Sequence, residues 1–138
     1  MNGTWDLNNT LAANLLLEGK PVQSARVMEK SMKDLPMKNY SIRDTLNRMY
    51  TTENLYGLNR INSANKLAKE TNDFLLQEMD YISTLTPELQ QARMQEIRLA
   101  LYVWGTLDKM TATYDQKELN GVIKGNFNRM MNTFGVRS

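Results

Sequence analysis

The chain has 138 residues, a formal net charge of +2, 41% hydrophobic residues, and neither cysteine nor histidine. Its length fits one domain with a sizeable core. Its basic residues are interspersed with acidic ones, and this distribution does not indicate a nucleic-acid partner. Without cysteine and histidine it has no thiol nucleophile, no disulfide and none of the commonest general bases or neutral metal ligands, so we expect no cofactor and no metal.

Apolar residues recur at helical spacing along the chain, whereas no stretch alternates apolar and polar residues over the length of a strand. We therefore predict an all-α protein of about six helices. The first helix spans about residues 6–18 and ends at Gly19, and Pro21 begins a second helix that Pro36 stops. The turn between these two helices is so short that they must lie antiparallel.

Two further helix pairs follow in chain order. A third helix begins near Ser41 and breaks at Gly57, and a fourth carries a long apolar stripe. Thr86, a cap residue followed by proline, begins a fifth helix that ends around Tyr114, and a sixth follows. We expect a single domain over residues 1–138, made of antiparallel hairpins at about 6–35, 41–84 and 87–134.

Glycines interrupt the apolar pattern of the sixth helix. Gly121 and Gly125 each weaken a helix by roughly 1 kcal/mol against alanine, so a packing reason for them is expected. We predict that they allow a close approach of the sixth helix to the fifth.

Two stretches, KPVQSARVMEK and NRINSANKLAK, repeat one pattern at an offset of 39 positions. The aligned pairs are Val22 with Ile61, Ser24 with Ser63, and Ala25 with Ala64. We interpret Val22, Ala25, Ile61 and Ala64 as packing positions, at which the small alanine lets two helices cross near the turn. Helix pairs that repeat at a near-fixed period predict an α-solenoid, in which stacked hairpins complete one another's cores.

This pattern resembles the tetratricopeptide class, which has a period of about 34 residues and an alanine early in the second helix of each hairpin. Proline often ends that helix, as Pro36 does here. The third hairpin lacks the alanine, and we interpret it as a divergent capping hairpin.

The segments LLLEGKPVQSARVMEKSMKDLP, LYGLNRINSANKLAKETNDFL and DYISTL resemble the soluble C-terminal region of a bacterial family of large multi-pass membrane proteins. That family is of unassigned function and is related to protein O-mannosyltransferases; the resemblance covers roughly residues 10–110. Its catalytic residues lie in the membrane portion, so none is carried onto this chain. The resemblance implies a non-catalytic soluble tail of a glycosyltransferase-like protein, tethered at the periplasmic face of the inner membrane. The membrane portion of its own parent chain is then a candidate partner.

Candidate binding residues lie on the third helix, because the first helices of successive hairpins line the concave face of a solenoid. The set consists of Asn47, Arg48, Tyr50, Asn54 and Tyr56. They are candidates for a groove that binds a protein or peptide. The alternative is that Tyr50 and Tyr56 pack between hairpins, with their hydroxyl groups at the edge.

Paired carboxylates are the most serious candidates for catalytic residues in the chain. Asp115 and Glu118 lie one turn apart near a helix start, where acids favour the helix dipole, and Glu78 and Asp80 point to different sides of a helix. We therefore expect a non-enzymatic protein-interaction module. Three alternatives stay open: a free-standing cytoplasmic adaptor, a sugar- or peptide-binding module, and a structural oligomerisation domain. With no apolar run of about 18 residues, we expect no direct membrane insertion.

Overall fold

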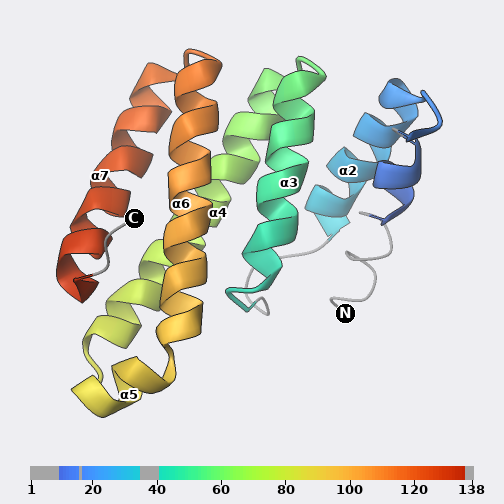
Figure 1. Cartoon of the computed structure of the whole chain (residues 1–138). Coiled ribbons are helices and arrows are strands. Elements are labelled where there is room, and N and C mark those ends of the chain that lie inside the picture. The colour runs from blue at the N-terminus through green and yellow to red at the C-terminus, as the bar shows by residue number, and fades with distance from the viewer. Residues whose placement is uncertain (1–9, 16, 35–40, 136–138) are drawn as a thin grey trace. The chain divides into compact units, whose positions relative to one another are not determined.

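The computed structural model describes residues 10–15, 17–34 and 41–135, and every regular element in these ranges is a helix (Figure 1). Residues 10–15 form the first helical segment. The helices after it are α2 (Pro21–Asp34), α3 (Asp44–Gly57), α4 (Ile61–Ser83), α5 (Pro87–Ala92), α6 (Met94–Thr113) and α7 (Lys117–Phe134). The structure thus confirms the predicted all-α class. The stacking of the hairpins into a tetratricopeptide-like solenoid stays a prediction.

The chain divides into two compact units, Met1–Ala68 and Lys69–Ser138, and the boundary lies inside α4. We refer to them as the N-terminal unit and the C-terminal unit. A single domain over residues 1–138 stays a prediction.

The same main-chain turn closes three helical hairpins. Its central residue has a positive φ, which is 76° at Gly19, 61° at Asn59 and 64° at Asp115. The following residue donates its N–H to the carbonyl oxygen five positions back: Lys20 to Leu15 at 2.8 Å, Arg60 to Leu55 at 2.8 Å, and Gln116 to Thr111 at 2.9 Å. A left-handed residue followed by such a bond is the Schellman helix end. The third hairpin therefore differs in sequence from the other two but closes in the same way.

This turn fixes the register of the repeat. Because Gly19 aligns with Asn59, Ser24 aligns with Ala64, one position away from the alignment that pairs the two serines. Ser24 and Ala64 are both fully buried. The packing role predicted for Val22 is wrong, since Val22 is 53% exposed. It lies two positions from Ser24, which is about 200° around the helix, so the two side chains face opposite ways.

The remaining repeat positions are placed as follows. Ala64 is fully buried, as a crossing position requires, and Ile61 is partly buried. The side chain of Ala25 lies outside the described residues. Ser63 is partly buried, and its hydroxyl donates to Oε2 of Glu29 on α2 at 2.9 Å. It therefore makes a contact between helices rather than repeating the role of Ser24.

A polar side chain reaches across the hairpin at equivalent positions of the first and third hairpins. Ser24 donates its hydroxyl to the carbonyl oxygen of Ala12 at 2.7 Å. Asn120 donates from Nδ2 to the carbonyl oxygen of Asp108 at 2.9 Å. We call this bond the clasp. The second hairpin has Ala64 at the same position and so has no clasp.

The predicted fifth helix is two helices in the structure. Thr86 caps α5 by accepting the N–H of Leu89 at 3.3 Å, as its sequence predicts. The chain then leaves helical geometry at Arg93 (φ −107°, ψ 18°), where α6 begins. The guanidinium group of Arg93 bonds the carboxylate of Glu96 at 2.7 Å, which fixes this first turn of α6. The expectation of one continuous helix from Thr86 to Tyr114 is therefore corrected.

Candidate functional site

The five residues predicted to line a groove on the third helix do not share one exposed face of α3. Arg48 and Tyr56 are 0% and 1% exposed, whereas Tyr50 is 52% exposed. Asn47 and Asn54 are partly buried. The expectation of a groove that presents all five side chains is therefore corrected. The physical reason is that the buried side of α3 carries polar residues, namely Thr45, Arg48, Thr51 and Thr52.

Tyr56 is buried, and its polar contact lies within its own α3–α4 hairpin, so packing of Tyr50 and Tyr56 between hairpins stays a prediction. The hydroxyl of Tyr56 donates to Oδ1 of Asn65 on α4 at 2.5 Å. Desolvation by burial raises the pKa of Tyr56 to about 12. A phenol held in this way is a structural group and is not accessible to a ligand from solvent.

A groove of about 410 Å³ lies between α6 and α7 in the C-terminal unit, where the two helices run side by side (Figure 1). Its lining consists of Arg98, Leu101, Tyr102, Gly105, Thr106, Asp108, Lys109, Phe127 and Met131. We call it the α6–α7 groove. Its volume is within the range of protein sites that bind ligands or anchor side chains.

Gly105 shapes the floor of the α6–α7 groove. A Cβ atom added at Gly105 would lie 3.3 Å from Cζ of Phe127, so the ring covers the bare backbone at this point. At Gly121 and Gly125 an added Cβ atom would meet nothing within 4 Å. The close approach predicted for Gly121 and Gly125 is therefore wrong, and it occurs at Gly105 instead.

Several polar groups in the groove already have intramolecular partners. The hydroxyl of Thr106 donates to the carbonyl oxygen of Tyr102 at 2.9 Å. Oδ1 of Asp108 accepts from Nδ2 of Asn120 at 2.7 Å. The surfaces left for an occupant are therefore apolar at the centre, at Leu101, Phe127 and Met131, with half-exposed Tyr102 beside them.

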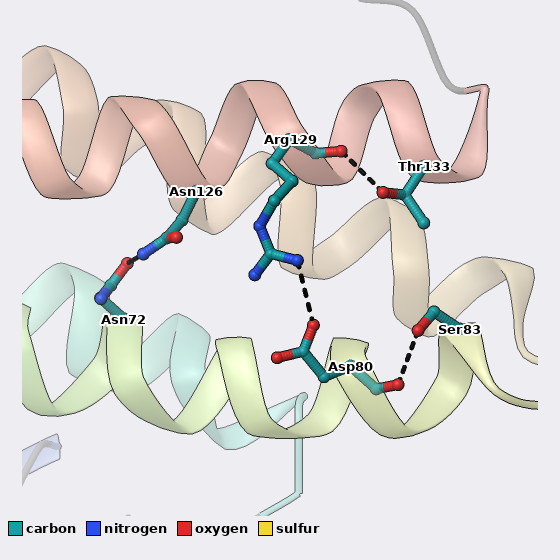
Figure 2. Close-up of polar contacts among 6 residues, drawn as sticks. All are labelled: Asn72, Asp80, Ser83, Asn126, Arg129 and Thr133. Atoms are coloured by element: carbon teal, nitrogen blue, oxygen red, sulfur yellow. Dashed lines mark hydrogen bonds and ion pairs between the residues drawn. The ribbon is translucent and has the colours of Figure 1, made fainter.

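Hydrogen bonds to α4 hold both walls of the groove. Within the C-terminal unit, Nε1 of Trp104 on α6 donates to Oδ1 of Asn72 at 2.9 Å. Nδ2 of Asn126 on α7 donates to the same oxygen at 3.2 Å, as Figure 2 shows. Arg129 and Asp80 form an ion pair at 3.3 Å farther along these two helices (Figure 2). The groove is therefore preformed, because each of its walls is fixed to a third helix.

Sequence reasoning missed this groove. The signal available was Gly105, an interior glycine in an otherwise strongly helical apolar stretch, for which a packing reason is expected. Its partner Phe127 lies on the next helix, so only the pairing of the two helices reveals the contact.

Three of the four carboxylates considered for catalysis are placed as follows. Asp115 is the left-handed residue of the α6–α7 turn, and Glu118 lies in the first turn of α7. Asp80 is paired with Arg129. The described residues contain no group of three or more acidic, histidine or cysteine side chains that could hold a metal ion.

Comparisons with family models, with curated proteins and with solved structures gave no match. Among the helices described, none combines the length and the apolar character needed to cross a membrane.

Proposed function

We propose that this chain is a non-catalytic helical-repeat module that binds a protein or peptide partner in the α6–α7 groove. The observation that carries the proposal is the apolar centre of this groove at Leu101, Phe127 and Met131, left open between two helices that are bonded to α4. A preformed site favours binding, because less conformational entropy is lost when the partner docks.

The common turn at Gly19, Asn59 and Asp115 supports the helical-repeat part of the proposal. Stacked helical hairpins serve in proteins as extended binding surfaces. The narrower proposal, which rests on the sequence resemblance, is that the module is the soluble tail of a bacterial glycosyltransferase-like membrane protein at the periplasmic face. Its partner is then either the membrane portion of the parent chain or a separate protein.

Site-directed photo-crosslinking tests the proposal with a matched pair of tyrosines. Tyr102 borders the groove and is 55% exposed, whereas Tyr50 on α3 is 52% exposed and is not part of the groove. A photoreactive phenylalanine analogue is placed at either position, and the full chain is irradiated in extracts of membrane and soluble fractions. We expect one defined crosslinked protein with the analogue at position 102 and none with it at position 50.

The captured protein is then purified and titrated against Tyr102→Ala and Tyr50→Ala. Aromatic residues at the centre of an interface commonly contribute more than about 1 kcal/mol, so Tyr102→Ala should weaken binding roughly tenfold while Tyr50→Ala leaves it unchanged. Crosslinking only at position 50, or equal weakening by both substitutions, would contradict the proposed site.

The sugar- or peptide-binding alternative was motivated by Tyr50, Tyr56 and the scattered acidic residues. Tyr56 is buried and bonded to Asn65, so it cannot offer a ring face to a sugar. A thermal-shift screen against sugars tests what is left of this alternative, since a ligand that binds the folded state raises the melting temperature.

A further inference from the structure

We infer that the α6–α7 groove receives an acidic amphipathic helix, with apolar anchors in its centre and carboxylates at its two ends. This inference rests on the proposed function, because it names the chemistry of the partner for that same groove. It is carried by the order of charges along α6, by the position of one further cation on α7, and by the hydrogen-bonding state of the walls.

One stripe of α6 carries a cation at each end of the groove. Arg98, Tyr102, Gly105 and Lys109 follow the i, i+4, i+7, i+11 spacing, which places them on one side of a helix. Arg98 and Lys109 are both exposed, and eleven positions of an α-helix span about 16 Å. The groove therefore presents two positive charges separated by an apolar centre.

One further cation lies on α7, three positions before the lining residue Phe127. This residue is Lys124, which is exposed and one helical turn away from Phe127. Arg98, Lys109 and Lys124 form no ion pair with any described residue. Asp108 is the only carboxylate in the lining, and it already accepts a hydrogen bond from Asn120. An acidic partner therefore finds cations that are not neutralised within the described structure.

The walls favour a helical partner over an extended one. An extended peptide must find partners for its own N–H and C=O groups, whereas a helix satisfies them internally. The walls are two α-helices whose main-chain groups are bonded within them, and the hydroxyl of Thr106 is bonded to the carbonyl of Tyr102. A helix offers side chains at i, i+3, i+4 and i+7, and three of its turns match the distance between Arg98 and Lys109.

Three synthetic peptides of about 18 residues test the inference against the full chain by fluorescence anisotropy. The first places Phe and Leu on one helical face and Glu on the flanks, at a separation of three turns. The second replaces every Glu with Lys, and the third replaces Phe and Leu with Ser. We expect the first peptide to bind roughly tenfold more tightly than the second, because opposite charges across an interface favour association and like charges oppose it. The third peptide should not bind.

Rim substitutions provide the matched controls. Arg98→Gln and Lys109→Gln should each weaken binding of the acidic peptide roughly two- to fivefold, the size of an exposed ion pair. Lys117→Gln, on the exposed first turn of α7 and outside the lining, should leave binding unchanged. All three changes are at exposed positions, and circular dichroism checks that each variant keeps its helix content.

Equal binding of the acidic and basic peptides, or no effect of the rim substitutions, would overturn the inference and leave the proposed function standing. Binding of the serine peptide would also overturn it, because the attraction would then need no apolar anchor. A version of the acidic peptide with a central proline cannot form a continuous helix and should bind at least roughly tenfold more weakly; equal binding would contradict the helical partner. If no peptide binds, the inference fails, whereas the proposed function is judged separately by the crosslinking and titration experiments at positions 102 and 50.

Discussion

Helices α3 and α6 each open a hairpin, and each carries an exposed tyrosine; the tyrosine of α6 borders the α6–α7 groove, and that of α3 does not. Tyr50 and Tyr102 are almost equally exposed. Each helix also buries an aromatic side chain whose polar atom bonds an asparagine of α4: Tyr56 bonds Asn65, and Trp104 bonds Asn72. Each of the two helices is therefore held to α4 by the same kind of contact, a bond from a buried aromatic side chain to an asparagine.

The difference between α3 and α6 lies in which residues each helix places beside its exposed tyrosine. α6 has Gly105 three positions after Tyr102, and the missing side chain lets Phe127 of α7 lie against the backbone. The buried face of α3 instead carries threonines and an arginine. The α6–α7 groove therefore depends on the neighbouring helix as well as on the exposed ring of Tyr102.

The largest expected effect separates the inner and outer faces of α6. Trp104→Ala removes a fully buried ring and should lower the free energy of unfolding by about 3–5 kcal/mol. Tyr102→Ala removes a half-exposed ring and should change it by less than about 0.5 kcal/mol. Urea denaturation followed by circular dichroism measures both. Similar losses from the two substitutions would mean that Tyr102 is part of the core and is not available to a partner.

A second prediction concerns the buried phenol of α3. Its folded pKa is about 12, above the ordinary value of 10.0, so the unfolded chain loses this proton first as pH rises. Stability from this group is therefore fully present below pH 10 and is lost as pH rises toward 12. The loss approaches about 2–3 kcal/mol, since each pKa unit corresponds to about 1.4 kcal/mol.

Urea denaturation at a series of pH values measures this dependence in the wild-type chain and in Tyr56→Phe. Other tyrosines and lysines also titrate in this range, so the difference between the two chains is the relevant quantity. Parallel curves for the two chains would contradict the burial of an intact phenol.

Removing the clasp should have a smaller effect on the free energy of unfolding, and it allows the first and third hairpins to be compared. Ser24→Ala and Asn120→Ala each remove an intramolecular hydrogen bond and should lower the free energy of unfolding by about 0.5–1.5 kcal/mol. Asn120 also donates to Oδ1 of Asp108 and to Oγ1 of Thr111, so its loss should be the larger of the two. Chemical denaturation of both variants tests the ranking, and the reverse order would contradict a stabilising contribution from the two additional bonds of Asn120.

Helix glycines give the smallest expected effect. Gly121→Ala and Gly125→Ala place a Cβ atom in open space and should each raise the free energy of unfolding by about 0.5–1 kcal/mol. Gly105→Ala should gain less, because its Cβ atom must displace the ring of Phe127. Thermal denaturation of the three variants provides the comparison. An equal gain at Gly105 would mean that the ring moves away without cost.

The sequence predicted most helix positions because glycine, proline and cap residues stand between the apolar stripes. The break at Arg93 was missed, because neither glycine nor proline stands near it. The register of the repeat was shifted by one residue, since the alignment followed Ser24 and Ser63 and the conformation depends on Gly19 and Asn59. At this turn, the main-chain conformation gives the correct alignment of the repeats, whereas side-chain identity gives one that is shifted by one residue.

The candidate site was harder to predict than the fold. The buried face of α3 carries Arg48 and three threonines. Polar residues are typical of an exposed face, so the sequence did not show that this face is buried. The α6–α7 groove depends on Gly105 meeting Phe127 from another helix. A pattern within one helix carries no information about such a contact until the partner helix is known.

The common hairpin turn has a consequence for how this chain tolerates change over evolution. Its closing bonds join main-chain atoms, and glycine, asparagine and aspartate all serve as its left-handed residue. The spacing between turns varies while the turn itself is kept: Asn59 lies 40 positions after Gly19, and Asp115 lies 56 positions after Asn59. Related chains can therefore differ in sequence and in repeat length while each hairpin turn keeps its conformation. Comparing backbone conformation at these turns is then a more sensitive test of relationship than comparing residue identity.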